Sequence, residues 1–263
     1  MTAGPASERW TFWGTWVNPF TLEQFLETVR HEVRRGGRSL IVNHNVNSLA
    51  WFRKSPAFRS LYASGDYCFI DGTAVGLIAR LNGWPFRRKH RVAVLDWFWP
   101  LGDLAAREGW AVAHIGADDN TIAVARDRVT AREPTLKLAL ANGYFDPADP
   151  VENAEVIQWI EHQKPDVLLV GMGMPRQERW LQQNIDALPP CVVITVGGAL
   201  GYIGGSRPTP PRWLGPLGVE WLFRLMTEPR RLWKRYLVEP LPLVPRMVRD
   251  LCRSAGRWLV NRR

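Results

Sequence analysis

Short hydrophobic runs recur along the first two hundred residues of the chain, and turn-forming residues such as Gly, Asn and Asp close most of them. Val, Ile, Leu and Ala dominate these runs, with little alternation of polar and apolar residues. Continuous apolar runs of this length are typical of parallel strands that are buried on both faces. The predicted strands cover 39–45, 67–72, 110–116, 136–143, 166–173 and 191–198.

Between these runs the hydrophobic period changes to that of amphipathic helices. The helices predicted from it cover 21–36, 120–133, 151–163 and 176–188. The first begins with Thr21 and Gln24, which form a capping-box pattern, and ends at Gly36. Strands that alternate with helices predict an α/β fold with a doubly wound, mostly parallel, Rossmann-like sheet. Ligands of such sheets bind at the carboxyl ends of the strands.

The pattern changes after a segment rich in Gly and Pro at 204–216. Helical patterns without strands follow at 218–228, 229–237 and 244–263, and prolines mark the breaks between them. We therefore predict two units. Residues 1–205 form an α/β domain with its ligand site at the strand ends, and residues 206–263 form a helical appendage.

Charge separates the same two parts. Residues 1–205 contain 21 Lys and Arg against 21 Asp and Glu, whereas residues 206–263 contain 13 against 4, so the net charge of +9 lies in the appendage. Four tryptophans are interleaved with these arginines: Trp213, Trp221, Trp233 and Trp258. Basic and aromatic residues together favour a surface that meets anionic headgroups, diphosphates or nucleic acid over a merely solvated helical tail.

The cysteines and the lack of long apolar runs indicate the cellular compartment of the protein. Cys68, Cys191 and Cys252 lack the spacing of a metal site, which favours reduced thiols and a cytosolic chain. We expect no signal peptide and no membrane-spanning helix, because neither a leader pattern nor a long uncharged apolar run is present. The sequence predicts a cytoplasmic protein that is soluble or peripheral to a membrane.

Polar residues collect where the predicted strands end. Asn43 and Asn45 close the first strand, Asp71 and Gly72 close the second, and Gln177 comes just after the fifth. Parallel strand ends share one crevice, so these residues are expected to converge there. Asp71 could take a proton from an attacking hydroxyl, but an Asp before Gly-Thr is equally a helix N-cap, and the spacing leaves both readings open.

Glycines at strand ends point to a phosphate-type ligand. Gly116 ends the third strand, and Gly171 and Gly173 begin the segment GMGMPRQERWL. This segment resembles the G-x-G-x-x-G fingerprint of dinucleotide sites, but Arg176 occupies the third glycine position. We therefore expect a different diphosphate ligand, bound by glycine-flanked amides and a helix N-terminus.

Several other chemistries are poorly supported. The sequence contains no D-x-D, HExxH or CxxC motif, and residues 117–120 (ADDN) are better explained as a helix cap, so we predict no metal site and no cofactor. The absence of a G-x-S-x-G elbow and of a Walker A loop argues against hydrolases and P-loop proteins.

Several segments together resemble one family. They are FIDGTAVGLIARLNG (69–83), NGYF (142–145), GMGMPRQERWL (171–181), VGGALGYIGG (196–205) and RPTPPRWLGPLGVEWLFRLMTEPRRLWKRYL (207–237). With Asn45, they make the sequence similar, from about residue 10 to residue 240, to the WecG/TagA/CpsF family of bacterial glycosyltransferases. The co-occurrence of the G-x-G-x-P-x-Q-E and E-W-x-x-R-L-x-x-E-P-x-R blocks is specific.

The resemblance implies an inverting, metal-independent transfer of a sugar from a nucleotide diphosphate sugar to a polyprenyl-diphosphate-linked sugar at the inner face of the cell membrane. It implies Asp71 as catalytic base, with Asn45 and Gln177 in the active site. The basic residues expected to close over the nucleotide diphosphate are Arg224, Arg231 and Lys234. An anionic membrane surface is then a partner, nucleic acid is not, and homo-oligomerisation is left open.

The chain departs from the family pattern near the expected donor site. Asn43 stands where the family commonly has Thr, Val94 where it has Gly, and Ala117 at the second position of a Gly-Gly turn. These differences affect which sugar and which nucleobase of the donor are bound, more than the type of reaction. Two rival functions remain at this point: a nucleotide-dependent Rossmann oxidoreductase, and a non-enzymatic basic module that binds membranes.

Overall fold

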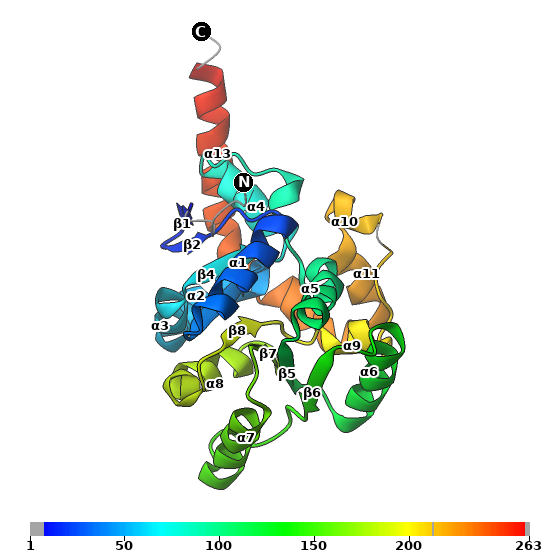
Figure 1. Ribbon diagram of the computed structural model, residues 1–263. Helices are drawn as coiled ribbons and strands as arrows, with labels where there is room; N and C mark the ends of the chain where they lie inside the picture. Colours follow the sequence, from blue (N-terminus) through cyan, green and yellow to red (C-terminus); the bar gives the residue numbers. More distant parts are fainter. Residues whose placement is uncertain (1–7, 212, 261–263) are drawn as a thin grey trace.

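The computed structural model describes residues 8–211 and 213–260, and its centre is a parallel sheet of six strands in the order β4-β3-β8-β7-β5-β6 (Figure 1). The strands are β3 (Ser39–His44), β4 (Tyr67–Ile70), β5 (Ala111–Gly116), β6 (Lys137–Ala141), β7 (Val167–Gly171) and β8 (Val192–Thr195). Each of the six hydrophobic runs forms one strand of this sheet. The prediction of a doubly wound parallel sheet is confirmed.

An additional hairpin precedes the sheet. Strand β1 (Trp10–Phe12) pairs antiparallel with β2 (Thr15–Val17), and Trp13 and Gly14 form the turn with φ values of 55° and 78°. Two consecutive residues with positive φ are characteristic of a type I′ hairpin turn. The sequence analysis did not predict this hairpin, because strands this short carry almost no periodicity.

Helices connect the strands. They are α1 (Leu22–Arg35), α2 (Val46–Lys54), α3 (Pro56–Ser64), α4 (Thr73–Leu81), α5 (Val94–Glu108), α6 (Asp119–Arg132), α7 (Pro150–Gln163), α8 (Arg176–Asn184) and α9 (Leu200–Gly204), with 3-10 turns η1 (Arg88–His90) and η2 (Ile185–Ala187). The predicted helices correspond to α1, α6, α7 and α8, whereas α2 to α5 were not predicted. The capping box of Thr21 and Gln24 is present at α1, and Gly36 ends that helix with a φ of 71°.

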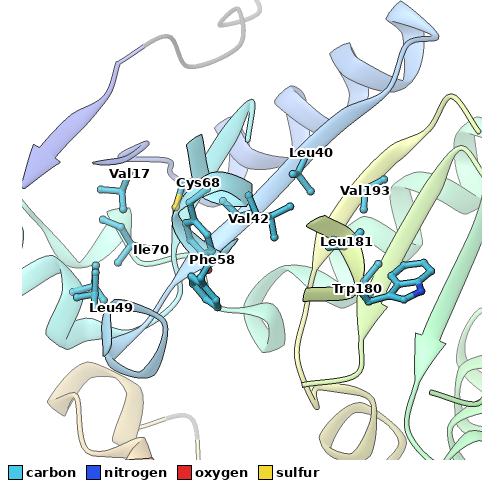
Figure 2. Close-up of a cluster of buried hydrophobic side chains, with 14 of the residues drawn as sticks. Val17, Leu40, Val42, Leu49, Phe58, Cys68, Ile70, Trp180, Leu181 and Val193 are labelled. Carbon is cyan, nitrogen blue, oxygen red and sulfur yellow. The ribbon is translucent and has the colours of Figure 1, made fainter. Parts of the chain in front are cut away.

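Successive strand residues point to opposite faces of the sheet and fill two separate cores. In β3, Leu40 and Val42 pack with α2, α3 and α8, while Ile41 packs with α1 and α5 on the other face. Figure 2 shows the first of these cores, in which Trp180 and Leu181 of α8 lie close to Val193 of β8. Burial on both faces explains why the strands are apolar throughout.

Beyond β8, the described part of the chain contains helices and no strand. Its elements are α10 (Leu214–Leu217), α11 (Glu220–Thr227), α12 (Pro229–Trp233), the π-helix η3 (Lys234–Val238), η4 (Leu241–Leu243) and α13 (Val244–Val260). Leu243 belongs to the core shared with α2 and α3, and α13 packs against α4 before it projects from the body (Figure 1). Of the predicted 244–263 helix, residues 261–263 lie outside the described part. The division at residue 205 stays a prediction.

No helix among residues 8–211 and 213–260 combines the length and the apolar character needed to cross a bilayer. Cys68 and Cys191 are buried, Cys252 is exposed, and all three are free thiols.

Candidate functional site

Asp71 lies at the carboxyl edge of the sheet, where β4 ends beside β3. Its backbone N–H donates to the carbonyl of His44 (3.0 Å), which fixes the turn. Asn45 caps α2 through its Oδ1, and its Nδ2 donates to Oδ2 of Asp71 (3.3 Å). Gly72, whose backbone packs closely against Asn45, is the N-cap of α4 and no side chain caps that helix. The N-cap reading of Asp71 is therefore wrong, and its carboxylate is available to the neighbouring cavity.

A buried network holds this turn rigidly. His44 is bonded through its two ring nitrogens to the hydroxyls of Thr15 and Ser48, each at 2.8 Å, and burial lowers its pKa to about 3. The ring therefore stays neutral at physiological pH. Tyr62 stacks on it and donates its hydroxyl to the carbonyl of Asn43 (2.6 Å).

Asn43 is almost fully buried but still reaches the cavity beside Asp71. Its Nδ2 donates to the carbonyl (2.8 Å) and the hydroxyl (3.0 Å) of Thr195 at the end of β8. Its Oδ1 has no hydrogen-bond partner among the described residues. A buried acceptor without a partner is unusual, and it marks a place where a ligand hydroxyl or amide can donate.

Gln177 lies beneath the cavity and does not line it. Its Oε1 accepts from the backbone N–H of Gly197 (3.0 Å), and its Nε2 donates to Oε1 of Glu178 (2.7 Å). Both side chains are buried, and burial raises the pKa of Glu178 to about 7. This pair anchors the turn that follows β8, and that turn forms one wall of the cavity.

Three of the glycines predicted to bind substrate lie where β5 and β7 end. Gly171 and Gly173 line a cavity, whereas Gly116 lies against the backbone of Gly171, where a Cβ would come within 2.5 Å of its carbonyl group. A Cβ on Gly171 would likewise come within 2.5 Å of Nε2 of His114. Gly116 and Gly171 are thus required for the close approach of β5 and β7, and a ligand contact is not needed to explain them.

Two adjoining cavities occupy the carboxyl edge. The inner cavity, of about 60 Å³, contains Asp71 and is otherwise lined mainly by Asn43, Asn45, Met174, Gly197, Tyr202, Arg224, Arg231, Arg235 and Tyr236. The outer cavity, of about 270 Å³, shares Met174, Arg231 and Arg235 with it and extends over Asn47, Ala117, Tyr144, Gly171, Gly173, Arg207 and Glu239. Residues from β3, from the turn after β4, from α9 and from the C-terminal helices therefore meet in one place.

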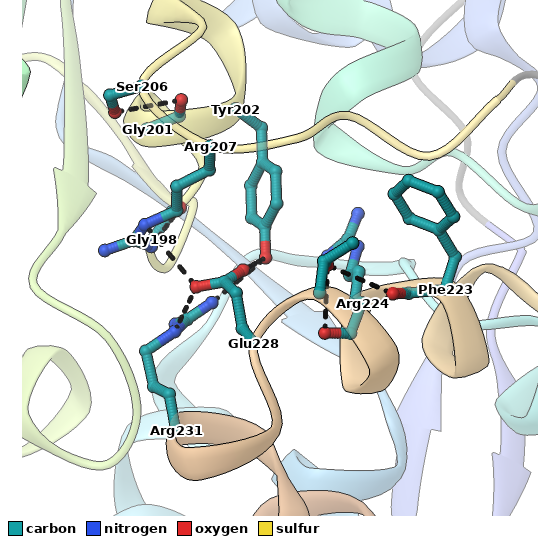
Figure 3. A network of polar contacts seen from close by, with 10 residues as sticks. Gly198, Gly201, Tyr202, Ser206, Arg207, Phe223, Arg224, Glu228 and Arg231 are labelled. Atoms are coloured by element: carbon teal, nitrogen blue, oxygen red, sulfur yellow. Dashed lines mark hydrogen bonds and ion pairs between the residues drawn. The ribbon is translucent and has the colours of Figure 1, made fainter.

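Arginines of the C-terminal helices cover these cavities and are held by a polar network with Glu228 at its centre (Figure 3). Glu228 accepts from Nε of Arg231 (2.6 Å) and from the hydroxyl of Tyr202 (2.6 Å), and Nε of Arg207 lies 3.7 Å from it. The guanidinium of Arg224 stacks on the Tyr202 ring, 4.6 Å from the ring centre. Glu228 thus pairs with Arg231 and Arg207, and Arg224 is held beside them through the Tyr202 ring.

Two of the arginines have donor groups that nothing in the described part of the chain satisfies. The Nε atoms of Arg224 and Arg235 are buried without a hydrogen-bond partner there. Burial alone would lower the pKa of Arg224, but the nearby tyrosines and Asp71 outweigh it and the pKa is raised, so the charge persists. Buried, charged and unsatisfied donors are suited to a multiply charged anion such as a diphosphate.

The structure brings Arg224 and Arg231 together but leaves Lys234 outside. Lys234 is exposed, lines neither cavity and lies near the Trp233 ring, whereas Arg235 lines both cavities. Residues 231 and 235 are four apart, so they occupy the same face of the helical segment. That spacing was visible in the sequence and could have identified Arg235. Tyr202, Arg207 and Glu228 lie within the segments that resemble the family, but nothing in those segments singled them out as site residues.

The site can therefore accept a proton at one carboxylate while several guanidiniums bind an anion close by. Among the described residues, no three His, Cys, Asp or Glu side chains gather in a way that could hold a metal ion.

The chain is similar in sequence to a family of known proteins. The sequence profile of the glycosyl transferase WecG/TagA/CpsF family matches residues 10–257. A protein of Bacillus spizizenii is 28% identical over 216 residues, which cover 82% of this chain and 80% of that protein, and it is named N-acetylglucosaminyldiphosphoundecaprenol N-acetyl-beta-D-mannosaminyltransferase. A Staphylococcus aureus protein of the same name is 27% identical over 195 residues, 74% of this chain and 73% of its own length.

Proposed function

Because the chain belongs to the WecG/TagA/CpsF family of glycosyltransferases, we propose that it transfers a hexosyl or N-acetylhexosaminyl group, such as N-acetylmannosamine, from a nucleotide diphosphate sugar to a polyprenyl-diphosphate-linked sugar. This reaction builds a cell-surface polysaccharide. The observation that carries the proposal is that Asp71 and the arginine cluster line one cavity at the carboxyl edge of the sheet. The oxidoreductase and the non-enzymatic module find no support in the comparisons.

Asp71 acts as the general base. The acceptor hydroxyl attacks the anomeric carbon of the donor sugar, its proton passes to the Asp71 carboxylate, and the bond from that carbon to the diphosphate breaks. The hydrogen bond from Nδ2 of Asn45 orients the carboxylate. The relatives form a β-linked product, so an α-linked donor requires inversion, which a single displacement with one base provides.

The arginines stabilise the departing nucleoside diphosphate. Arg224 and Arg235 offer buried donors, and Arg231 is held in place by Glu228. Guanidinium groups form charge-assisted bonds to phosphate oxygens, and these strengthen as negative charge develops on the leaving group. The outer cavity, with glycine backbones on one side and Tyr144 on another, has room for the nucleoside.

We further propose that the protein lies on the inner face of the cell membrane. Leu241, Val244, Val248 and Leu251 form an exposed apolar stripe with helical spacing on η4 and α13, opposite the buried side of these helices. Arg249 and Arg253 are exposed on the same helix. An apolar stripe flanked by arginines binds an anionic lipid surface, and the relatives' lipid-linked acceptor resides in such a membrane.

The test is to measure transfer from UDP- and GDP-linked sugars to a synthetic polyprenyl diphosphate sugar. We expect Asp71→Asn to lower kcat by a factor of about 10² to 10⁴, because the base is lost while the shape is kept. Arg224→Gln should raise the KM for the donor by about tenfold or more. Asp127→Asn, an exposed carboxylate on α6, is the matched control. Full activity in Asp71→Asn would refute the assigned mechanism.

A further inference from the structure

A second cationic cavity lies outside the inner and outer cavities and shares no lining residue with them. It has a volume of about 490 Å³ and lies between α4 and the segment that follows it. Thr73, Leu77 and Arg80 face it from one side of α4, and Arg87, Arg88 and Arg91 face it from the following segment. Its described lining contains four arginines and no acidic residue, so it attracts anions.

Three of these arginines are uncommitted. Arg80, Arg87 and Arg88 are exposed and form no ion pair within the described part of the chain. Arg91 differs, because it is paired with Asp96 (3.4 Å) and with Glu220. Three adjacent positive charges without counter-charges repel one another, and binding an anion relieves that repulsion.

The segment that carries the arginines is fixed in place by aromatic contacts. The ring of Phe86 packs so tightly on Gly76 of α4 that a side chain at Gly76 would overlap it. Trp84 stacks on Trp10 with ring centres 5.9 Å apart, and His90 meets the same Trp10 ring edge-on at 5.1 Å. The arginines therefore project from an ordered support, which lowers the entropic cost of binding a ligand.

The cavity is directly connected to Asp71. Nε of Arg91 donates to the backbone carbonyl of Asp71 (3.2 Å), and Val92 bonds to the carbonyl of Ile70 at the end of β4 (2.9 Å). Thr73 on its wall is only two residues beyond Asp71. Asp71 itself lines the inner cavity, so Arg91 and Thr73 connect the second cavity to the strand end that carries the carboxylate.

We propose that this cavity binds the diphosphate of the lipid-linked acceptor, through Arg80, Arg87 and Arg88. This rests on the proposed function. In the relatives' acceptor the diphosphate is joined to the N-acetylglucosamine that receives the new sugar, so it is one sugar ring away from the hydroxyl that must meet Asp71. Two diphosphates then flank the base, the donor's on Arg224 and Arg235 and the acceptor's on this second cluster.

The surroundings also suit the lipid that follows the diphosphate. Leu77, half-exposed on α4, offers an apolar contact within the cavity. Helix α4 packs against α13, where Nδ2 of Asn82 donates to Asp250 (2.9 Å), and α13 carries the exposed apolar stripe (Figure 1). The lipid chain thus leaves the cavity beside the surface that we assign to the membrane.

The test compares Arg80→Gln and the double variant Arg87→Gln/Arg88→Gln with Arg126→Gln, an exposed arginine on α6. The acceptors are farnesyl-diphospho-N-acetylglucosamine and an alkyl N-acetylglucosaminide without phosphate. We expect the KM for the diphosphate acceptor to rise about tenfold, because charge-assisted bonds are lost. We expect kcat, the KM for the donor and all constants for the alkyl acceptor to stay within about twofold of the original, and Arg126→Gln to change nothing.

The proposal would be overturned by an unchanged KM for the diphosphate acceptor, by an equal rise for the alkyl acceptor, or by a rise in donor KM. Weaker sedimentation with phosphatidylglycerol vesicles at an unchanged acceptor KM would assign the cluster to bulk headgroups and also overturn it. Calorimetric titration of farnesyl-diphospho-N-acetylglucosamine without donor tests the acceptor site separately from the proposed reaction. Binding that the variants lose, in a protein without transferase activity, refutes the proposed reaction but supports this site.

Discussion

Replacing Glu178 by Gln should stabilise the protein at alkaline pH and leave its stability unchanged in acid. Glu178 is buried at the start of α8 and accepts one hydrogen bond from Gln177, while its Oε2 has no partner among the described residues. Burial raises its pKa from 4.5 to about 7. Glutamine keeps the shape and the accepting oxygen but carries no charge, so it removes only the cost of ionisation.

The magnitude follows from linkage between protonation and folding. Below pH 4.5 the carboxyl is protonated in both the folded and the unfolded chain, and it contributes no penalty. As the pH rises to about 7 the unfolded chain releases the proton and the folded chain keeps it, so the folded state is destabilised progressively. At 1.36 kcal/mol per pKa unit, the full penalty above pH 7 is about 3 kcal/mol.

Urea unfolding at pH 5, 6, 7 and 8 measures this effect, and the 14 tryptophans of the chain provide the fluorescence signal. The difference in unfolding free energy between Glu178→Gln and the original protein should grow from about 1 kcal/mol at pH 5 towards about 3 kcal/mol at pH 8. Glu152→Gln, an exposed position on α7, is the control. A difference that does not depend on pH would refute the reasoning, because it would mean that Glu178 ionises equally in both states.

Two further predictions concern the supports of the site. Burial lowers the pKa of His44 to about 3 and of His114 to about 4, so both rings stay neutral in the folded chain while the unfolded chain takes up protons below pH 6.5. In the Glu178→Gln background, the unfolding free energy should therefore fall by up to about 2.7 kcal/mol per pH unit as the pH is lowered from 6 to 5. An unfolding free energy that does not change over this range would contradict the prediction. Leu243→Ala should lower the unfolding free energy by about 3 kcal/mol, because Leu243 is buried in the core. Leu241→Ala, at an exposed position, should change it by less than about 0.5 kcal/mol. Equal effects of the two substitutions would show that the C-terminal helices do not share that core.

The sequence by itself determined the sheet and the type of reaction. Strands buried on both faces must be continuously apolar, so the six runs were visible without any tertiary information. Asp71 was likewise visible, because a parallel strand that ends in a polar residue delivers it to the edge where ligands bind. The blocks around Gln177 and Arg224 then pointed to the family, to which the profile match assigns the chain.

Only the tertiary structure decided what each of these residues contacts. Gln177 proved to bond beneath the cavity to Gly197, Lys234 faces solvent beside the arginine that lines the cavity, and Asp71 is not a helix cap. These outcomes depend on the rotation of helices and on hydrogen bonds between distant segments, and neither leaves a periodic trace in the sequence. The strand period of two residues and the helix period of 3.6 are local properties, whereas the meeting of Asp71 with arginines more than 150 residues away is set by how the C-terminal helices pack on the sheet.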